Sequence, residues 1–212
     1  MRNDYAYIDH DHTYTNSQTG VLRNLADIVV QDALEFFEST TVAKRIKELK
    51  DHPVKITDST ALLTIHKYLF QDVYQWAGLK RVVEISKGGK PFFPTSRFST
   101  AFAYIDNLLT EYREIDKTDK AEIAEKLAVI LDVINYLHPF REGNGRAQRE
   151  FLRTLALEKG FELNLNPPDN ADIYERYMTG TIDGDTKKLA ALIFEIMQER
   201  EFIKNTETQA ER

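Results

Sequence analysis

Hydrophobic side chains recur along most of the chain at intervals of three and four residues, which is the period of amphipathic helices. The helices predicted from this pattern cover roughly 21–38, 40–50, 58–77, 97–114, 119–137, 145–159, 170–179 and 186–202. The 119–137 segment has the clearest pattern, because its apolar positions step by four and three from Ile123 to Leu137. Asp119 and Glu122 have the spacing of a capping box at its start.

One stretch departs from the helical period. RVVEISKGGKPFFP, residues 81–94, is β-branched, then Gly-Gly, then aromatic, which is typical of a β-hairpin. We expect this hairpin to be the only β element. Residues 1–20 are polar and aromatic without a helical period, so we expect an extended N-terminal arm. The pattern predicts a mostly α protein, with 1–212 forming a single domain.

Composition narrows the function classes. A net charge of −6 argues against a dedicated nucleic-acid binder, and the absence of cysteine excludes disulfides and thiolate metal sites. No apolar run approaches the roughly 20 residues that span a bilayer, and the first residues lack a secretory-signal pattern. We therefore expect neither nucleic acid nor a membrane segment, and a cytoplasmic or cytoplasm-delivered protein.

HPFREGNGRAQRE, residues 138–150, lies between two predicted helices and carries the most distinctive chemistry. Pro139 cannot continue a helix, so His138 should lie at the end of the first one. Glycines at 143 and 145 let the backbone approach a phosphate closely. The second helix would then begin near Gly145, offering its first N–H groups to an anion.

Charged side chains in this run suit a nucleotide with magnesium. Arg146 and Arg149 are three residues apart, so they share one helix face and could bind a polyphosphate. Glu142 supplies one carboxylate for Mg²⁺, whose remaining ligands would be phosphates and water. His138 is the side chain best suited to accept a proton near neutral pH. Together these features suggest attack by a hydroxyl on a phosphate.

A less specific interpretation stays open from local chemistry alone. Gly-Asn-Gly turns between helices are common, and arginines at a helix start usually face solvent. No strand precedes the loop, as a Walker-type phosphate loop would require.

The run from His138 to Arg149 resembles the Fic-domain signature, H-x-F-x-[DE]-G-N-G-R-x-x-R, at every fixed position. IHKYLFQDVYQWAGLKR (65–81) resembles the upstream Fic helix, and EISKGG resembles the start of the family's flap. TYTNSQTGVLRN is similar to the lead-in of bacterial Fic proteins such as the Bartonella effectors. The resemblance implies the Fic fold: a helical bundle around a two-helix motif, here 119–160, with the 81–94 hairpin as flap.

The family's usual activity is transfer of AMP from ATP to a Ser, Thr or Tyr hydroxyl of a target protein, with release of pyrophosphate. The resemblance implies that His138 is the general base, that Phe140 anchors the loop in the core and that Glu142 holds Mg²⁺. It further implies an anion hole formed by Gly143, Asn144 and Gly145, phosphate binding by Arg146, and a γ-phosphate contact from Arg149.

Gly145 favours AMP transfer over phosphoryl transfer, because death-on-curing relatives that phosphorylate their target carry lysine at this position. Transfer of another nucleotide or phosphate moiety stays open. A non-catalytic scaffold that binds nucleotide or a partner is the competing class, although the intact motif argues against it.

The flap is expected to dock the target as an added strand near the base. The residues expected to do so are Ile85, Ser86, Lys87, Gly88 and Gly89, with the turn at 87–89. The alternative is a hairpin that only covers the core with Phe92 and Phe93.

Many Fic proteins carry an inhibitory helix with [ST]-x-x-x-E-[GN], whose glutamate contacts the arginine matching Arg149. No complete match occurs in this sequence. We therefore expect either a separate small antitoxin-like inhibitor that supplies a glutamate to Arg149, or a chain that is the Fic domain of a longer protein. A toxin acting in the bacterial cytoplasm and an effector delivered into a host cytosol both fit.

Other candidate residues are weaker. His10 and His12 could suggest a metal site, but no further spaced ligand accompanies them. His66 fits a packed or capping histidine better than a catalyst. Tyr174 or Tyr177 could line the adenine, since this segment lies near the nucleotide in relatives.

Overall fold

The computed structural model describes residues 5–7, 9 and 12–200. Within these residues the helices are α1 (Gln31–Asp51), α2 (Ala61–Phe70), α3 (Phe98–Glu114), α4 (Lys120–Leu137), α5 (Asn144–Glu158), α6 (Ala171–Asp183) and α7 (Thr186–Ile196), with a 3-10 turn at Thr95–Arg97. The strands are β1 (Tyr5–Tyr7), β2 (Ile85–Lys87), β3 (Lys90–Pro91), β4 (Phe161–Glu162) and β5 (Gln198–Glu199). The mostly helical fold predicted from the sequence is confirmed. None of the helices in the described part of the chain has the length and apolarity to cross a bilayer.

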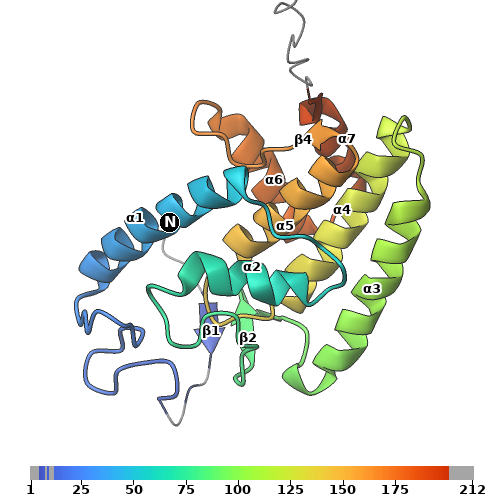
Figure 1. Ribbon diagram of the computed structural model, residues 1–212. Coiled ribbons are helices and arrows are strands. Elements are labelled where there is room, and N and C mark those ends of the chain that lie inside the picture. Colours follow the sequence, from blue (N-terminus) through green and yellow to red (C-terminus); the bar gives the residue numbers. More distant parts are fainter. Residues whose placement is uncertain (1–4, 8, 10–11, 201–212) are drawn as a thin grey trace, which may run out of the picture.

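Helix α4 is the centre of the bundle and packs against α3, α5, α6 and α7 (Figure 1). Its predicted apolar stripe is buried, from fully buried Ile123 to Leu137. α2 crosses α5 on the side of the bundle where the hairpin lies, and α1 packs against α2 (Figure 1). This arrangement brings the end of α4, the start of α5, α1 and the hairpin to one region.

The predicted hairpin is confirmed as β2 and β3. Its turn is Gly88-Gly89, with φ of 56° and 76°, which is the region that glycine adopts without strain. The expectation that it would be the only β element is wrong. β1 pairs with β2 to give a three-stranded antiparallel sheet in the order β1-β2-β3, and β4 pairs with β5. Strands of two or three residues are too short for the alternating pattern that sequence analysis uses.

Several predicted helix boundaries are also wrong. Residues 21–30 contain no helix, because the Asn24 side chain binds the backbone of Leu22 and Ile28 and competes with helical hydrogen bonds. The segments predicted at 21–38 and 40–50 are replaced by one helix, α1. Ser39 lies within this helix, and its hydroxyl donates to the carbonyl of Phe36 at 2.9 Å.

The helix predicted to end at Gly78 ends at Phe70, and turns follow. Gly78 closes these turns with a φ of 80°, and its N–H donates to His66 Nδ1. Helix α7 ends at Ile196, and residues 201–202 of the predicted helix lie outside the described residues.

Asp119 is the N-cap of α4, as its spacing from Glu122 predicted. The Asp119 carboxylate accepts a hydrogen bond from the N–H of Glu122 at 2.9 Å. We expect Asp119→Ala to lower the free energy of unfolding by about 1 kcal/mol, because it leaves a helix-terminal N–H without its cap. Asp119→Asn keeps an acceptor and should match the wild type in urea denaturation. Equal stability of the alanine and asparagine variants would show that the cap contributes nothing.

Candidate active site

His138 is the C-cap of α4 and lies in left-handed backbone geometry, with φ 43° and ψ 61°. This conformation costs a non-glycine residue about 1–2 kcal/mol, so the surrounding contacts must impose it. Pro139 follows and stops the helix, as predicted. The side chain is buried, at 5% exposure, and its ring stacks on Phe92 of the hairpin at 3.9 Å.

The tautomer of His138 follows from its hydrogen bond. Nδ1 lies 3.0 Å from the carbonyl oxygen of Asn135, and a carbonyl can only accept, so Nδ1 carries the proton. The lone pair of the neutral ring therefore resides on Nε2. Burial lowers the pKa of His138 to about 3 from 6.5. The ring is thus unprotonated at neutral pH, which is the state that a general base requires.

The loop between α4 and α5, residues 138–143, is irregular backbone inside the protein, and side chains from elsewhere bind its carbonyls. Arg81 is buried and donates from Nε to the carbonyl of His138, and its N–H donates to Pro139. Asn144 accepts from the N–H of Phe140 and donates to its carbonyl, at 2.9 and 2.8 Å.

His66 holds the same loop from α2. Its Nε2–H donates to the carbonyl of Glu142 at 2.9 Å, and its ring stacks on Phe140 at 3.7 Å. Phe140 itself has no exposed surface. The prediction that His66 is a packed or capping residue agrees with these contacts, but its support of the 138–143 loop was missed, as was that of Arg81. Neither residue has a local sequence signal, because their partners are more than fifty positions away.

Gly143 is required by geometry at the start of α5. It has a φ of 83°, and a Cβ there would lie 2.3 Å from the ring of Phe70. The predicted start of α5 is confirmed to within a residue, since the helix begins at Asn144. The N–H groups of its first turn have no acceptors within the helix, and they give this end of α5 its positive potential.

Two of the three arginines on α5 are paired with carboxylates. Arg146 forms an ion pair with Glu38 of α1 at 2.5 Å, and Tyr74 donates its hydroxyl to the same carboxylate. Arg153 binds Glu150 through two hydrogen bonds of 2.8 and 2.6 Å. The role of Glu38 was not predicted, because Glu38 is more than a hundred residues from Arg146 along the chain.

Arg149 has no carboxylate partner among residues 5–7, 9 and 12–200. Its guanidinium lies 5.5 and 5.6 Å from the rings of Tyr174 and Tyr177. Tyr177 is buried, and its hydroxyl accepts a hydrogen bond from the side-chain amide of Gln148, which holds the ring next to this cation. Gly145 leaves room beside Arg149, since a Cβ at 145 would lie 3.2 Å from its Nη1.

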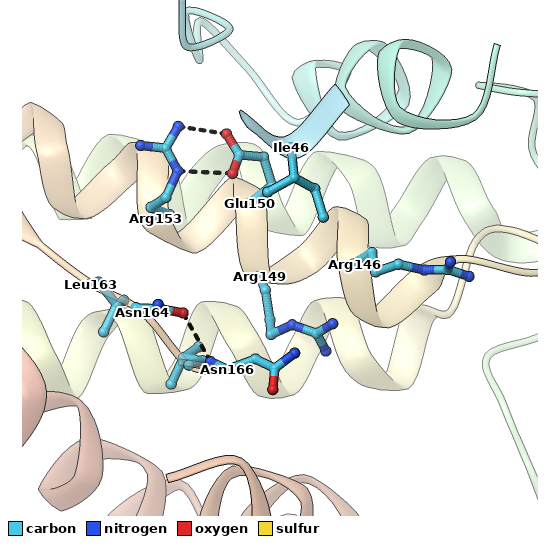
Figure 2. A pocket seen from close by; sticks show the side chains of 9 residues that line it. Ile46, Arg146, Arg149, Glu150, Arg153, Leu163, Asn164 and Asn166 are labelled. Carbon is cyan, nitrogen blue, oxygen red and sulfur yellow. Dashed lines mark hydrogen bonds and ion pairs between the residues drawn. The ribbon is translucent and has the colours of Figure 1, made fainter. Parts of the chain in front are cut away.

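Arg146 and Arg149 line one pocket of about 100 Å³. Figure 2 shows both guanidinium groups extending to the same side of α5, whereas Arg153 points away towards Glu150. The rest of the lining comes from α1, from α5 and from the segment after β4: Ile46, Glu150, Arg153, Leu163, Asn164, Leu165 and Asn166. Three arginines line the pocket, and Arg149 is the one that has no carboxylate partner among the described residues. Such a cationic site suits a multivalent anion.

Glu142 lies at the edge of this site with its side chain a quarter exposed. Its Oε1 accepts from the N–H of Gly143 at 2.8 Å and lies 3.4 Å from Arg146. The described residues contain no cluster of three or more His, Cys, Asp or Glu side chains that could hold a metal. A single accessible carboxylate fits Mg²⁺ whose other ligands are phosphates and water.

The hairpin lies beside His138 through Phe92. Of the predicted docking residues, Ile85 is buried, Ser86 and Lys87 are partly buried, and the glycines at 88 and 89 are exposed. One edge of β2 pairs with β3, and the other pairs with β1 in the register Tyr5↔Lys87, Ala6↔Ser86 and Tyr7↔Ile85. The edge of β2 that does not pair with β3 is therefore occupied by β1, the chain's own N-terminal strand.

The remaining candidates predicted from the sequence are His10, His12 and Tyr174. His10 lies outside the described residues, and His12 bonds to the nearby Thr15 hydroxyl through Nδ1. Tyr174 is half-buried, and its ring lies 5.5 Å from the guanidinium of Arg149.

The sequence model of the Fic/DOC family matches residues 56–156, which include the hairpin, the 138–143 loop and most of α5. A probable protein adenylyltransferase of Sinorhizobium fredii is 36% identical over 180 residues, covering 82% of this chain and 90% of that protein. The protein adenylyltransferase VbhT of Bartonella schoenbuchensis is 32% identical over 188 residues, covering 88% of this chain. This chain spans only 39% of that relative's length.

Solved structures agree on the fold. The BepC protein of Bartonella tribocorum, crystallised with AMPPNP, has a TM-score of 0.78 at 21% identity and covers 90% of this chain and 98% of that one. The N-terminal Fic domain of a Bartonella quintana effector, crystallised with ADP, has a TM-score of 0.77 at 22% identity, covering 90% of this chain and 96% of that one. The chain belongs to the Fic/DOC family.

The buried state of His66 predicts how stability depends on pH. Burial lowers its pKa to about 3 from 6.5, so between these values the unfolded chain binds a proton that the folded chain does not. Its contribution is complete above pH 6.5 and is lost as the pH falls towards 3. At pH 5 the loss should be about 2 kcal/mol.

His66→Gln keeps an N–H donor for Glu142 and removes the titration. Urea denaturation at pH 7 and pH 5 should therefore show a drop that is smaller by about 2 kcal/mol in the variant. An identical drop in wild type and variant would contradict a neutral, buried His66.

Proposed function

We propose that this chain is a protein adenylyltransferase that transfers AMP from Mg-ATP to a Ser, Thr or Tyr hydroxyl of a target protein. The observation that carries the proposal is that two features lie at the two ends of the 138–143 loop. His138 is held as a neutral base with its lone pair on Nε2, and α5 begins beside it with the uncompensated cation of Arg149. Relatives named adenylyltransferases, and neighbours crystallised with nucleotides, support the same activity.

The proposed roles follow the positions of the side chains. His138 Nε2 takes the proton of the target hydroxyl as its oxygen attacks the α-phosphorus, and pyrophosphate leaves. The first N–H groups of α5, at Asn144 and Gly145, bind phosphate oxygens. Arg149 binds the γ-phosphate, and so aligns the α-phosphate with the attacking oxygen.

Glu142 would hold Mg²⁺, which neutralises charge on the phosphates when bound. Arg146 forms an ion pair with Glu38, which already compensates its charge. We propose that Arg146 contacts the phosphates while Glu38 and the ring of Phe70, 4.6 Å away, fix its direction. The side chain of Asn144 braces the loop, so its part in the anion hole is assigned to its backbone N–H.

Two features bear on partners. The flap is proposed to dock the target segment near His138, because Phe92 of the hairpin stacks on that ring. We further propose a separate small inhibitor that supplies a glutamate to Arg149. Its support is that no carboxylate of the described residues pairs with Arg149, whereas Arg146 and Arg153 both have one.

The activity is tested with ATP labelled on either the α- or the γ-phosphate, together with Mg²⁺ and a bacterial lysate. We expect transfer of the α-label alone, with a loss of about 10²-fold or more in His138→Ala because the general base is missing. His52→Ala, at the surface end of α1, is the matched control. Transfer of the γ-label would indicate phosphoryl transfer instead.

Calorimetry of the same variants separates a scaffold from an enzyme. Nucleotide binding without any label transfer would favour the scaffold. Label transfer that appears only after deletion of an internal helix would contradict the proposal of a separate inhibitor.

The γ-phosphate contact predicts a selective change in affinity. Arg149→Ala should weaken ATP binding by roughly 10–100-fold, the effect of losing a hydrogen bond to a charged group of about 1.5–3 kcal/mol. AMP has no γ-phosphate, so its affinity should not change. Isothermal titration with both nucleotides measures this, and an equal loss for ATP and AMP would remove the γ-phosphate assignment.

A further inference from the structure

Arg81 is a buried cation whose guanidinium binds backbone carbonyls in two parts of the candidate active site. The residue is 2% exposed. Its Nε donates to the carbonyl of His138 at 2.9 Å. Nη1 donates to the carbonyl of Val83 at 2.7 Å, and Nη2 donates to that of Phe93 at 2.6 Å. Each nitrogen of the guanidinium therefore binds a different carbonyl.

The three carbonyls belong to the proposed base and to the two ends of the hairpin. Val83 lies two residues before β2, and Phe93 lies two residues after β3. A guanidinium is planar, and its nitrogens have a fixed geometry. One rigid group thus sets the distance between the ends of the hairpin and the backbone of His138.

His138 needs such support because its backbone is in the left-handed region. The N–H of Arg81 donates to the carbonyl of Pro139 at 2.7 Å, so Arg81 binds two consecutive carbonyls of the loop. The bond from His138 Nδ1 to the carbonyl of Asn135 orients the ring relative to α4. Arg81 adds a second reference, because it relates the same residue to the hairpin.

Glu84 holds the guanidinium in this direction. Its Oε2 accepts from Arg81 Nη1 at 3.2 Å, and its Oε1 accepts from the N–H and the hydroxyl of Thr95 at 2.8 and 2.6 Å. The Glu84 side chain is 59% exposed, whereas that of Arg81 is fully buried. A substitution of Glu84 therefore loosens Arg81 without leaving a cavity in the core.

We propose that Arg81 is a positioning residue for adenylyl transfer: its guanidinium sets the place of His138 relative to a target segment docked on the hairpin. The inference rests on the proposed adenylyltransferase function. Arg81 acts through His138, and the proposed phosphate and metal contacts come from α5 and Glu142. Its loss should therefore slow the chemical step and leave ATP binding intact. A displacement of a reacting group by about 1 Å can lower a rate by about 10²-fold.

Arg81→Lys keeps the positive charge but has a single nitrogen, which cannot bind all three carbonyls. With a fixed amount of bacterial lysate, we expect the rate of α-label transfer at saturating Mg-ATP to fall by about 10–100-fold, while the KM for ATP is unchanged. Glu84→Gln should give a smaller loss of the same kind. Arg113→Lys is the matched control, because Arg113 also donates to two carbonyls, at 3.0 and 2.9 Å, and should keep the wild-type rate.

The ring current of Phe92 gives a readout that does not depend on turnover. The rings of His138 and Phe92 stack at 3.9 Å with an angle of 17° between their planes, so the C–H protons of His138 should resonate upfield of their positions in Phe92→Leu. In NMR spectra, Arg81→Lys should move these protons towards the Phe92→Leu positions, and Arg113→Lys should leave them where the wild type has them.

Three results would overturn the inference: a wild-type transfer rate in Arg81→Lys, a rise in the KM for ATP that matches the loss of rate, or ring protons of His138 that stay at their wild-type positions. Each of them leaves the adenylyltransferase function standing as long as the wild type transfers label in a His138-dependent way. The absence of that transfer in the wild type would reject both. If Arg81→Lys does not fold, Glu84→Gln takes its place in each comparison.

Discussion

The site depends on burying irregular backbone between α4 and α5. A buried peptide group without a hydrogen-bond partner costs free energy, and a loop cannot supply its own partners as a helix does. Arg81, His66 and Asn144 meet this requirement by binding the backbone of His138, Pro139, Phe140 and Glu142. Arg81 also donates to the carbonyls of Val83 and Phe93, so the same guanidinium ties the hairpin to the loop. His138 therefore keeps a left-handed backbone, and its ring stays fixed against Phe92.

Charge at the site is controlled by residues remote from the motif. Helix α5 presents arginines at 146, 149 and 153, and a carboxylate compensates the first and the last of them. The remaining cation, Arg149, lies against aromatic rings that attract it without neutralising it. Because the positive end of the α5 dipole adds to this charge, the favourable position for an anion is concentrated at the first turn of the helix. Because Glu38 pairs with Arg146, Arg149 is the guanidinium without a carboxylate partner among the described residues, although α1 contributes no residue to the motif.

The edges of the hairpin determine which segment can pair with it. β2 and β3 are only three and two residues long. The edge of a sheet carries backbone N–H and C=O groups that can pair with another extended segment. In this chain β1 is the segment that pairs with the edge of β2. The N-terminal strand and the hairpin that stacks on His138 therefore belong to one three-stranded sheet.

The sequence by itself determined the helical class, the turn at Gly88-Gly89, the capped start of α4 and the loop motif, because each depends on neighbours within a few positions. It misplaced the start of α1 and the end of α2, where side-chain bonds from Asn24 and His66 override the apolar period. Only the tertiary structure decided that His138 is neutral, that Arg149 rather than Arg146 has no carboxylate partner among the described residues, and that β1 pairs with β2. Burial, ion pairs and strand register arise from residues far apart in the chain, and no local pattern records which of them meet.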